Sequence, residues 1–330
     1  MFKQLLVSIL GLLSLSSVAL ANEAHQSNQP EVTPMQALQL DTNAGTLAAN
    51  LYLPEGYSGN ASEKLPVVVV TGAWTTVKEQ MAAVYAKALA DKGYAALTFD
   101  FEGWGESGKQ NTQVAKYLED PVRKTENIRA VIEAVSGLPF VDDTRIAGVA
   151  VCASSGYMLD AALNSDSIKA VAVVAPWLHD KAMATAIYGG EQSVQQLLAA
   201  SASAKVSNKP VYIEAASLTN ESALMYQAPY YTEKDRGLIP EYDNKFNVAS
   251  WDGWLNYDAQ LSAATIDKPV LMVASKDMAL PAGAEQYLEK AQDNVKAVWF
   301  DGYSQFDFYD QANAVSDAVN AIDQHFKTNL

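Results

Sequence analysis

Six short apolar runs, each rich in β-branched or small residues, constrain the fold of this chain more than any other feature of its sequence. Unbroken apolar runs are typical of strands buried on both faces, and their alternation with segments of helical period is typical of a mostly parallel sheet. The sequence therefore predicts an α/β fold, with a mostly parallel central sheet and helices on both of its faces. The runs are LPVVVVTG, YAALTFDF, TRIAGVAV, IKAVAVVAP, KPVLMVAS and VKAVWFDG.

Two segments depart from this alternation. Ahead of the first run, LQLDTNAGTLAANLYLPEG alternates apolar and polar residues around Asn43-Ala44-Gly45, which predicts a hairpin. After the fourth run, an aromatic-rich insertion at about residues 180–264 is expected to form a cap over the sheet. Its aromatic side chains either pack this cap or line an apolar pocket between cap and sheet. They are Tyr188, Tyr226, Tyr230, Tyr231, Tyr242, Phe246, Trp251, Trp254 and Tyr257.

The amino-terminal segment has the features of a secretory signal. Lys3 precedes the apolar stretch LLVSILGLLSL, and Ala19-Leu20-Ala21 is a small-x-small cleavage site. Residues 1–21 are therefore expected to be a signal peptide cleaved after Ala21, and residues 22–34 a mobile segment ahead of a single domain at 35–330. The apolar stretch is short for a spanning helix, so a secreted or periplasmic protein without stable membrane insertion is expected.

Composition narrows the range of partners. A net charge of -15 opposes binding to nucleic acid, whose phosphates require basic patches. No constellation of metal ligands stands out, and no cofactor is expected. Gly103 and Gly105 in EGWGESG are interpreted as tight-turn residues, because the strand–loop–helix spacing of a nucleotide-binding loop is absent. A small-molecule substrate is the partner that remains, and oligomeric state is left open.

The segment GVAVCASSGY has the pattern of a sharp turn from a strand into a helix that presents a nucleophile. Its candidates are Cys152, Ser154 and Ser155. Such a turn needs small residues two before and two after the nucleophile, and Ala150 and Ser154 meet this need around Cys152. Cys152 is therefore the predicted nucleophile, and Ser154 is expected to cap the helix that follows. A helix amino terminus is further expected to lower the pKa of the Cys152 thiol.

Several motifs occur in an order that resembles the alpha/beta-hydrolase superfamily, and within it the branch of dienelactone-hydrolase-like and polyketide-transferase-like proteins. They are VVVVTGAWTTVKEQ, FDFEGWGESG, AVCASSG, APWLHD, VLMVASKDMALP and GYSQFDFYD. The resemblance covers most of the chain after the signal peptide. It implies an alpha/beta-hydrolase fold, with the cap at about 180–264, but fold alone does not establish the chemistry.

The resemblance also assigns roles to individual positions. Asp277 in SKDMALP matches the catalytic acid, although a plain turn residue is the alternative. The backbone N–H of Ala153, with that of Ala73 or Trp74, is expected to form the oxyanion hole. Where related proteins carry the catalytic histidine, this chain has Gln305, which can hydrogen-bond to Asp277 but cannot carry a proton.

Three histidines remain as candidates for the missing base. His25 and His325 are interpreted as surface residues. His179 comes just after the fourth apolar run, where the chain leaves the sheet at its carboxyl-terminal edge, and ligands bind at this edge in such folds. His179 is therefore either an alternative base or a structural histidine at the cap hinge. A cysteine can still attack an activated acyl group without a base, because part of its population is already ionised at neutral pH.

Three functions follow from these residues. The first is an ester, lactone or thioester hydrolase or acyl transferase, of the carboxylesterase or dienelactone-hydrolase type, with Cys152 as nucleophile. The second is a catalytically impaired hydrolase-fold protein that keeps its pocket and binds a small molecule. The third is an interaction role for the cap surface. The distance between His179 and Cys152 is the feature expected to separate the first from the second.

Overall fold

A computed structural model describes residues 35–330 except 60–62, 112 and 164; the predicted signal peptide and lead-in segment lie outside the described residues. An eight-stranded sheet forms the centre, in the order β1-β2-β4-β3-β5-β6-β11-β12. From β4 to β12 neighbouring strands are parallel, and β2 joins them antiparallel. The strands are β1 Met35–Thr42, β2 Gly45–Tyr52, β3 Leu65–Thr71, β4 Ala95–Phe99, β5 Val141–Val151, β6 Ile168–Val174, β11 Val270–Ser275 and β12 Val295–Phe300.

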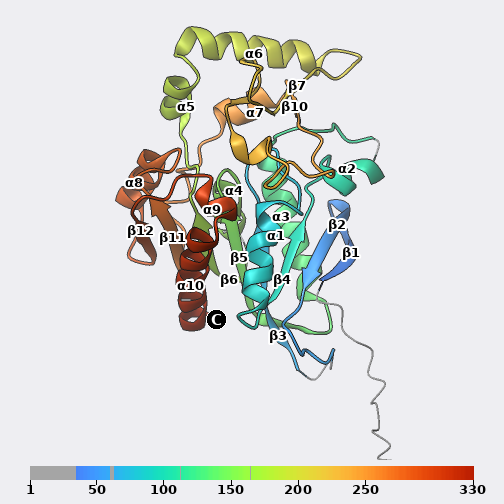
Figure 1. The fold of residues 1–330 in the computed structure, drawn as a ribbon, viewed down its shortest axis with the longest axis vertical. Coiled ribbons are helices and arrows are strands. Elements are labelled where there is room, and N and C mark those ends of the chain that lie inside the picture. The colour runs from blue at the N-terminus through green and yellow to red at the C-terminus, as the bar shows by residue number, and fades with distance from the viewer. Residues whose placement is uncertain (1–34, 60–62, 112, 164) are drawn as a thin grey trace, which may run out of the picture. The chain divides into compact units, whose positions relative to one another are not determined.

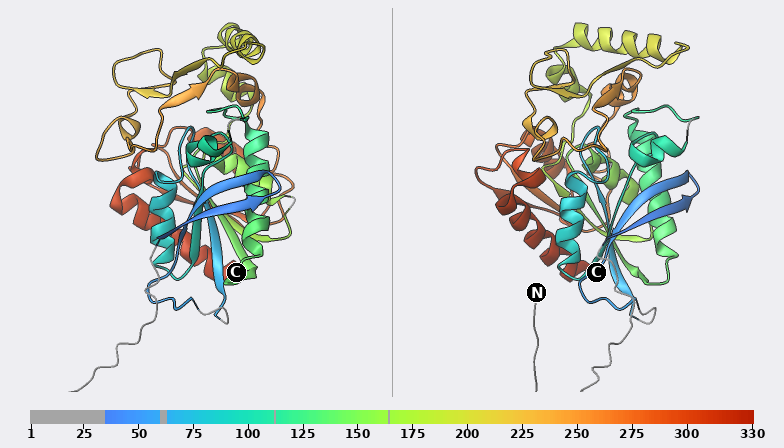
Figure 2. Two further views of the ribbon diagram at one scale, coloured as in Figure 1. Left: turned by 90° about the vertical axis from the view of Figure 1, so that its right-hand side faces the viewer. Right: turned by 45° about the vertical axis from the view of Figure 1, so that its right-hand side comes forward.

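Helices cover both faces of this sheet, as predicted (Figures 1 and 2). On one face α1 (Met81–Ala90) lies beside α10 (Ala312–Asn329), and on the other α3 (Pro121–Ser136) packs against α4 (Ser154–Ala162). Outside the insertion that follows β6, the remaining helices are α2 Gly105–Gln110, α8 Pro281–Lys290 and α9 Asp307–Asp310. The sheet is thus buried from both sides, which explains why its strands appear in the sequence as unbroken apolar runs.

Local signals in the sequence place some of these elements closely. The hairpin β1–β2 turns at Asn43-Ala44, with Thr42 opposite Gly45, and this confirms the alternating pattern. Helix α3 begins at Pro121, and the Asp120 carboxylate accepts a 3.1 Å hydrogen bond from the backbone N–H of Arg123. Helix α1 begins at Met81, directly after a turn in which the N–H of Val77 donates a 3.0 Å hydrogen bond to the Gln80 side chain.

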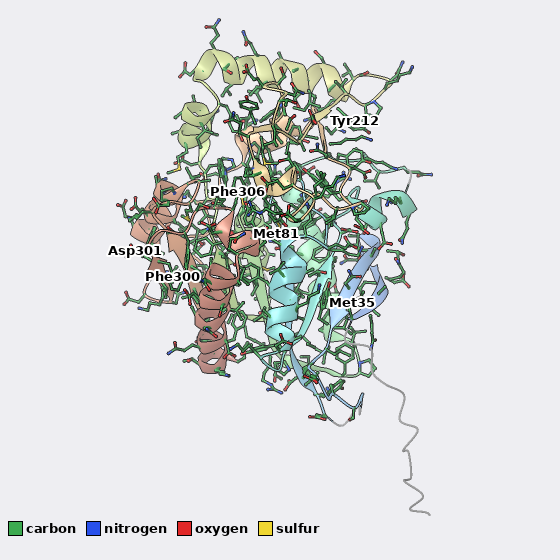
Figure 3. The ribbon with its side chains drawn as sticks, viewed as in Figure 1. Met35, Met81, Tyr212, Phe300, Asp301 and Phe306 are labelled. Carbon is green, nitrogen blue, oxygen red and sulfur yellow. The ribbon has the colours of Figure 1, made fainter. Side chains whose placement is uncertain are left out.

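The insertion after β6 forms a cap above the carboxyl ends of the parallel strands (Figure 1). Its elements are α5 Lys181–Ile187, α6 Glu191–Lys205, β7 Tyr212–Glu214, β8 Ala216–Ser217, β9 Met225–Tyr226, the 3-10 turn Pro229–Tyr231, β10 Lys245–Asn247 and α7 Ser250–Asn256. Figure 3 places Tyr212 within this cap and Phe306 at the edge of the sheet below it. Among the described residues, no helix is both long and apolar enough to cross a bilayer.

Candidate active site

The turn between β5 and α4 holds Cys152 in an uncommon backbone conformation. Its φ is +60°, in the left-handed region that costs a non-glycine residue about 1–2 kcal/mol. The surrounding hydrogen bonds keep it there: its N–H donates to the Val174 carbonyl at 3.0 Å, and its own carbonyl accepts from Trp177 at 3.0 Å. The strand end therefore turns sharply at Cys152, at the carboxyl edge of the sheet, where ligands bind in open α/β sheets.

The two serines beside it face the protein interior. The Ser154 hydroxyl bonds to the Val151 carbonyl and accepts from Thr71, and the Ser155 hydroxyl donates to the Ala150 carbonyl at 3.4 Å. The expected capping role of Ser154 is therefore wrong, because its hydroxyl bonds to the end of β5 and makes no bond to the start of α4. Both serines are buried, with hydroxyls engaged by main-chain atoms.

Three donor groups lie near the Cys152 sulfur and act to lower the pKa of its thiol. They are the hydroxyl of Tyr309 and the backbone N–H groups of Ala153 and Trp74. Ala153 starts the turn into α4, Trp74 lies in the loop after β3, and Tyr309 lies in α9. Ala153 and Trp74 were predicted as donors of the oxyanion hole, with Ala73 as the alternative to Trp74, whereas Tyr309 was not predicted. The one available signal for Tyr309 was its position in the motif GYSQFDFYD.

The loop after β3 determines which of its amides faces the sulfur. The N–H of Ala73 donates to the Met81 sulfur at 3.4 Å, so the amide of Trp74 is the one directed at Cys152. Thr75, with φ of +64°, donates its own N–H to the Glu119 carboxylate at 3.3 Å. Of the two amides that the sequence left open, the structure therefore brings Trp74 to the site.

Burial raises the pKa of the Cys152 thiol above its ordinary value. The three donors lower that pKa, but they do not offset the loss of solvation at a residue with only 7% of its surface exposed. The Ala153 N–H at the start of the helix acts in the expected direction, but burial outweighs it, so the net pKa of the thiol is raised. Cys152 is mainly a neutral thiol at pH 7, held in contact with groups that stabilise its anion.

Gln305 is fixed by hydrogen bonds at both ends of its side-chain amide. Its Oε1 accepts from the N–H of Ala279 at 2.9 Å, and its Nε2 donates to the Ala175 carbonyl at 2.9 Å and the Tyr309 hydroxyl at 3.2 Å. Asp277 is exposed, and its backbone N–H bonds to Ser275. Within the described part of the chain, no hydrogen bond or ion pair joins the Asp277 carboxylate to Gln305, so the expected Gln–Asp pairing is not formed.

His179 is buried at the cap hinge with both ring nitrogens engaged. Its Nδ1 accepts from the Trp177 indole at 3.1 Å, and its Nε2 donates to the Trp254 carbonyl at 3.0 Å. Burial lowers the pKa of this imidazole. Since neither nitrogen is free to accept a proton, the geometry favours the structural interpretation of His179 over that of an alternative base. His325 pairs with Asn329 in α10, and His25 lies outside the described residues.

A cavity of about 420 Å³ opens beside the Cys152 sulfur, between the sheet and the cap. Half of the residues that line it are aromatic, and none of the described lining residues carries a charge. Tyr188, Tyr231 and Trp254 are the cap aromatics that reach it, whereas Phe246 and Trp251 pack against Trp74 within the core. The lining residues are Trp74, Cys152, Ala153, Trp177, Ile187, Tyr188, Leu224, Met225, Tyr231, Trp254, Ala279, Gln305, Phe306 and Tyr309.

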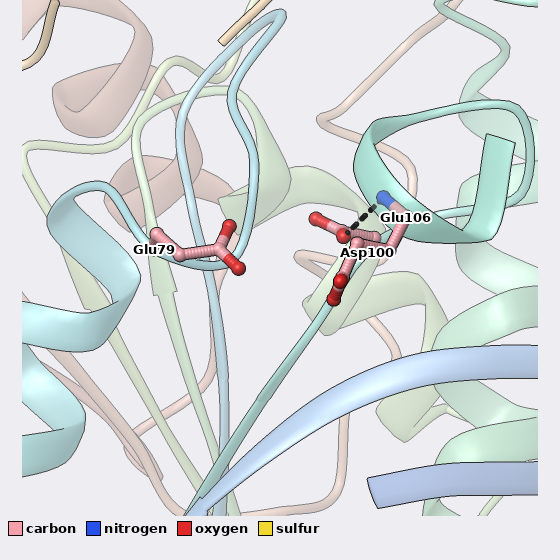
Figure 4. Close-up of side chains that lie close together, drawn as sticks. All are labelled: Glu79, Asp100 and Glu106. Atoms are coloured by element: carbon pink, nitrogen blue, oxygen red, sulfur yellow. Dashed lines mark hydrogen bonds between the residues drawn. The ribbon is translucent and has the colours of Figure 1, made fainter. Parts of the chain in front are cut away.

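A cluster of carboxylates lies apart from this cavity. Oxygens of Glu79, Asp100 and Glu106 come within 4.8 Å of one another, and Figure 4 shows their convergence. The buried Lys78 ammonium contacts all three, at 2.5, 3.0 and 2.5 Å. Lys78 therefore supplies the positive charge that a metal ion would bring. Gly105 is the first residue of α2 and not part of a turn; its φ is +47°, and a Cβ there would lie 2.3 Å from the Asp100 carboxylate.

A parallel sheet, a sharp strand-to-helix turn at its carboxyl edge and a cap above it define an alpha/beta hydrolase. Comparison with known protein families identifies the family within this class. Residues 11–198, more than half of the chain, match the FrsA-like esterase family, and the chain belongs to that family. The resemblance inferred from the sequence motifs is confirmed.

Known relatives extend the similarity over the rest of the chain. The uncharacterized protein YcjY of Escherichia coli K12 is 26% identical over 311 residues, 86% of this chain and 95% of the relative. The crystal structure of the hypothetical protein PA2218 of Pseudomonas aeruginosa superposes with a TM-score of 0.78 at 24% identity, over 91% of this chain and 96% of that one. The alpha/beta hydrolase GrgF from Penicillium gives 0.74 at 17% identity, over 90% and 99%. The match to the esterase family supports a hydrolase-type enzyme.

Proposed function

We propose that this protein is an acyl-transferring esterase that uses Cys152 as its nucleophile. The observation that carries the proposal is the placement of Cys152, which lines a cavity of about 420 Å³ and lies near two backbone N–H groups that act to lower the pKa of its thiol. The absence of charge from the described wall suits an uncharged acyl group of an ester, lactone or thioester. Burying an unpaired charged substrate there would be costly.

The amides of Ala153 and Trp74 would serve in two ways. In the free protein they donate to the sulfur and so favour the thiolate over the thiol. When a carbonyl enters and the sulfur attacks its carbon, the same N–H groups are placed to bind the developing oxyanion. One donor of this kind is worth about 2.7–4 kcal/mol of transition-state stabilisation in well-studied hydrolases.

The second half of the reaction would be slow to water. A thioester on Cys152 is hydrolysed when a base removes a proton from water, and the amide of Gln305 cannot do this. His179 has both nitrogens engaged, and the carboxylate of Asp277 is exposed. The acyl group is therefore held until a better nucleophile than water, such as an alcohol or amine, accepts it.

A second function is favoured by two of the same observations. The raised pKa of Cys152 and the locked amide of Gln305 would also suit a protein that binds an ester or lactone without turning it over. In that case the cavity keeps its ligand through burial of apolar surface alone. Ligand binding without a covalent adduct is the outcome that distinguishes the two.

Mass spectrometry of the intact protein tests the proposal. Incubation with 4-nitrophenyl butyrate is expected to add one butyryl group, which peptide mapping assigns to Cys152. Cys152→Ala, the matched control, should take up none. Release of nitrophenol without an adduct in either protein, or no reaction at all, would contradict a cysteine nucleophile.

Export belongs to the proposal as well. The motif Ala19-Leu20-Ala21 after an apolar stretch supports cleavage after Ala21 and a place of action outside the cytoplasm. Amino-terminal sequencing of the protein recovered from a periplasmic or culture fraction should read from Asn22. Recovery of the intact chain from Met1 in membranes would contradict it.

A further inference from the structure

Acylation of a neutral thiol requires two proton movements at one place. The thiol must lose its proton as the sulfur attacks, and the leaving group must gain one as it departs. In related hydrolases with a histidine, one imidazole performs both steps. Here burial holds the pKa of Cys152 high, so the thiol proton is present when the substrate arrives.

The Tyr309 hydroxyl lies near the Cys152 sulfur, and it is the side chain whose hydrogen-bonding capacity acts to lower the pKa of that thiol. Tyr309 is 1% exposed and lines the cavity together with Cys152. A second acceptor lies near it, because the Tyr231 and Tyr309 ring centroids are 6.3 Å apart and hydrogen bonding from Tyr309 acts to lower the pKa of the Tyr231 hydroxyl. When the Tyr309 hydrogen points to Tyr231, an oxygen lone pair is free to face the sulfur.

Gln305 holds this hydroxyl in place. Its Nε2 donates to the Tyr309 oxygen at 3.2 Å, and the opposite end of the amide is anchored by the Ala279 N–H. A donor on that oxygen stabilises the negative charge that builds up as the hydroxyl gives a proton away. The residue at the histidine position of the family therefore acts here on a neighbouring hydroxyl.

We propose that Tyr309 is the proton-transferring residue of this site, with Gln305 as its positioning residue. The inference rests on the proposed function, because it presupposes attack by Cys152. Tyr309 takes over both tasks of the missing imidazole during acylation. It does not take over deacylation, since a buried phenol, whose pKa is raised by burial, is a poor base toward water.

In the acylation of Cys152, the S–H bond breaks, a bond forms between sulfur and the acyl carbon, and the bond from that carbon to the leaving oxygen breaks. The thiol proton passes to the Tyr309 oxygen as the Tyr309 proton passes to the leaving oxygen, which departs as an alcohol. The leaving oxygen is bonded to the same carbon as the sulfur, so a hydroxyl in contact with the sulfur also reaches it.

Two butyryl esters that differ only in their leaving group test this role. The rate of Cys152 acylation is measured by intact mass for 4-nitrophenyl butyrate and for ethyl butyrate, with the full chain and with Tyr309→Phe. Ethoxide must be protonated to leave and nitrophenoxide need not be. We expect Tyr309→Phe to slow acylation by both esters, because it removes the acceptor of the thiol proton, and to slow ethyl butyrate at least about tenfold more, because only ethoxide also needs a proton to leave.

Tyr230→Phe is the matched control. Its ring packs against Tyr309 at a centroid distance of 5.0 Å, but its hydroxyl bonds to the backbone of Met81 and it does not line the cavity. Should Tyr309→Phe fold poorly, Gln305→Met removes the supporting N–H and is expected to show the same difference between esters, at a smaller size.

The outcomes separate the two proposals. Equal slowing of both esters in Tyr309→Phe would assign the tyrosine a packing role and overturn this inference while leaving the cysteine nucleophile intact. Absence of any adduct in the unaltered protein would overturn the proposed function and this inference with it. A tenfold or greater difference between the esters, seen in Tyr309→Phe and absent in Tyr230→Phe, would establish the proton transfer.

Discussion

The amide of Gln305 donates a 3.2 Å hydrogen bond to the hydroxyl of Tyr309. This bond joins the position where related hydrolases carry a histidine to a hydroxyl that contacts the Cys152 sulfur. A tyrosine hydroxyl thus lies between Gln305 and the nucleophile, but among the described residues that line the cavity none is a base that can deprotonate water.

Gln305→His is expected to shorten the lifetime of the acyl adduct at least about tenfold, because an imidazole at this position supplies the general base that deacylation lacks. The measurement is the decay of the Cys152 adduct by intact mass. Adding Asp277→Asn should return the lifetime close to its starting value, since an imidazole without a carboxylate partner is poorly oriented. An unchanged lifetime in Gln305→His would mean that water does not reach the thioester.

Cys152 is expected to react with iodoacetamide more slowly than a free thiol at pH 7. Its pKa is raised, so the reactive thiolate appears only as the pH rises beyond the ordinary thiol value of about 8.5. The measurement is the rate of alkylation against pH for the folded chain. The urea-unfolded chain is the control, and a matching midpoint in both states would contradict the burial effect.

The backbone at Cys152 is expected to store strain that glycine relieves. Since φ is +60° there, Cys152→Gly should be more stable than Cys152→Ala by about 1 kcal/mol, although both remove the thiol. Urea denaturation of the two variants measures the difference. Equal midpoints would indicate that the turn relaxes when the side chain is shortened.

A buried ion pair behind the site is expected to be sensitive to the loss of one partner. Lys124 and Glu119 are almost fully buried at an N–O distance of 2.7 Å, and Glu119 also accepts from Tyr157 and from the Thr75 amide. Glu119→Gln leaves the Lys124 charge without its counterion and should cost about 3–5 kcal/mol in the free energy of unfolding.

The exposed pair Lys205–Asp252 provides the control for this experiment. Both side chains are about half exposed, so Lys205→Ala should change the free energy of unfolding by no more than about 1 kcal/mol. A similarly small loss in Glu119→Gln would mean that water or a neighbouring dipole compensates Lys124. Thermal or urea unfolding of both variants gives the comparison.

The sequence by itself determined the class of fold and the position of the nucleophile turn. Unbroken apolar runs predict parallel strands because such strands are buried on both faces, and the small residues around Cys152 predict the sharp turn because a larger side chain would clash. The assignment of Gln305 to the position of the catalytic histidine came from the resemblance to the alpha/beta hydrolases and stays a prediction.

Only the tertiary structure decided what surrounds the sulfur. Tyr309 and Trp74 come from segments more than 70 residues from Cys152 in the sequence, and no local period records that they meet there. The pKa of the thiol is likewise a product of burial by the cap, which outweighs the nearby donors. Spacing in the sequence reports what a segment does locally, whereas hydrogen-bond partners and solvation depend on which distant segments pack together.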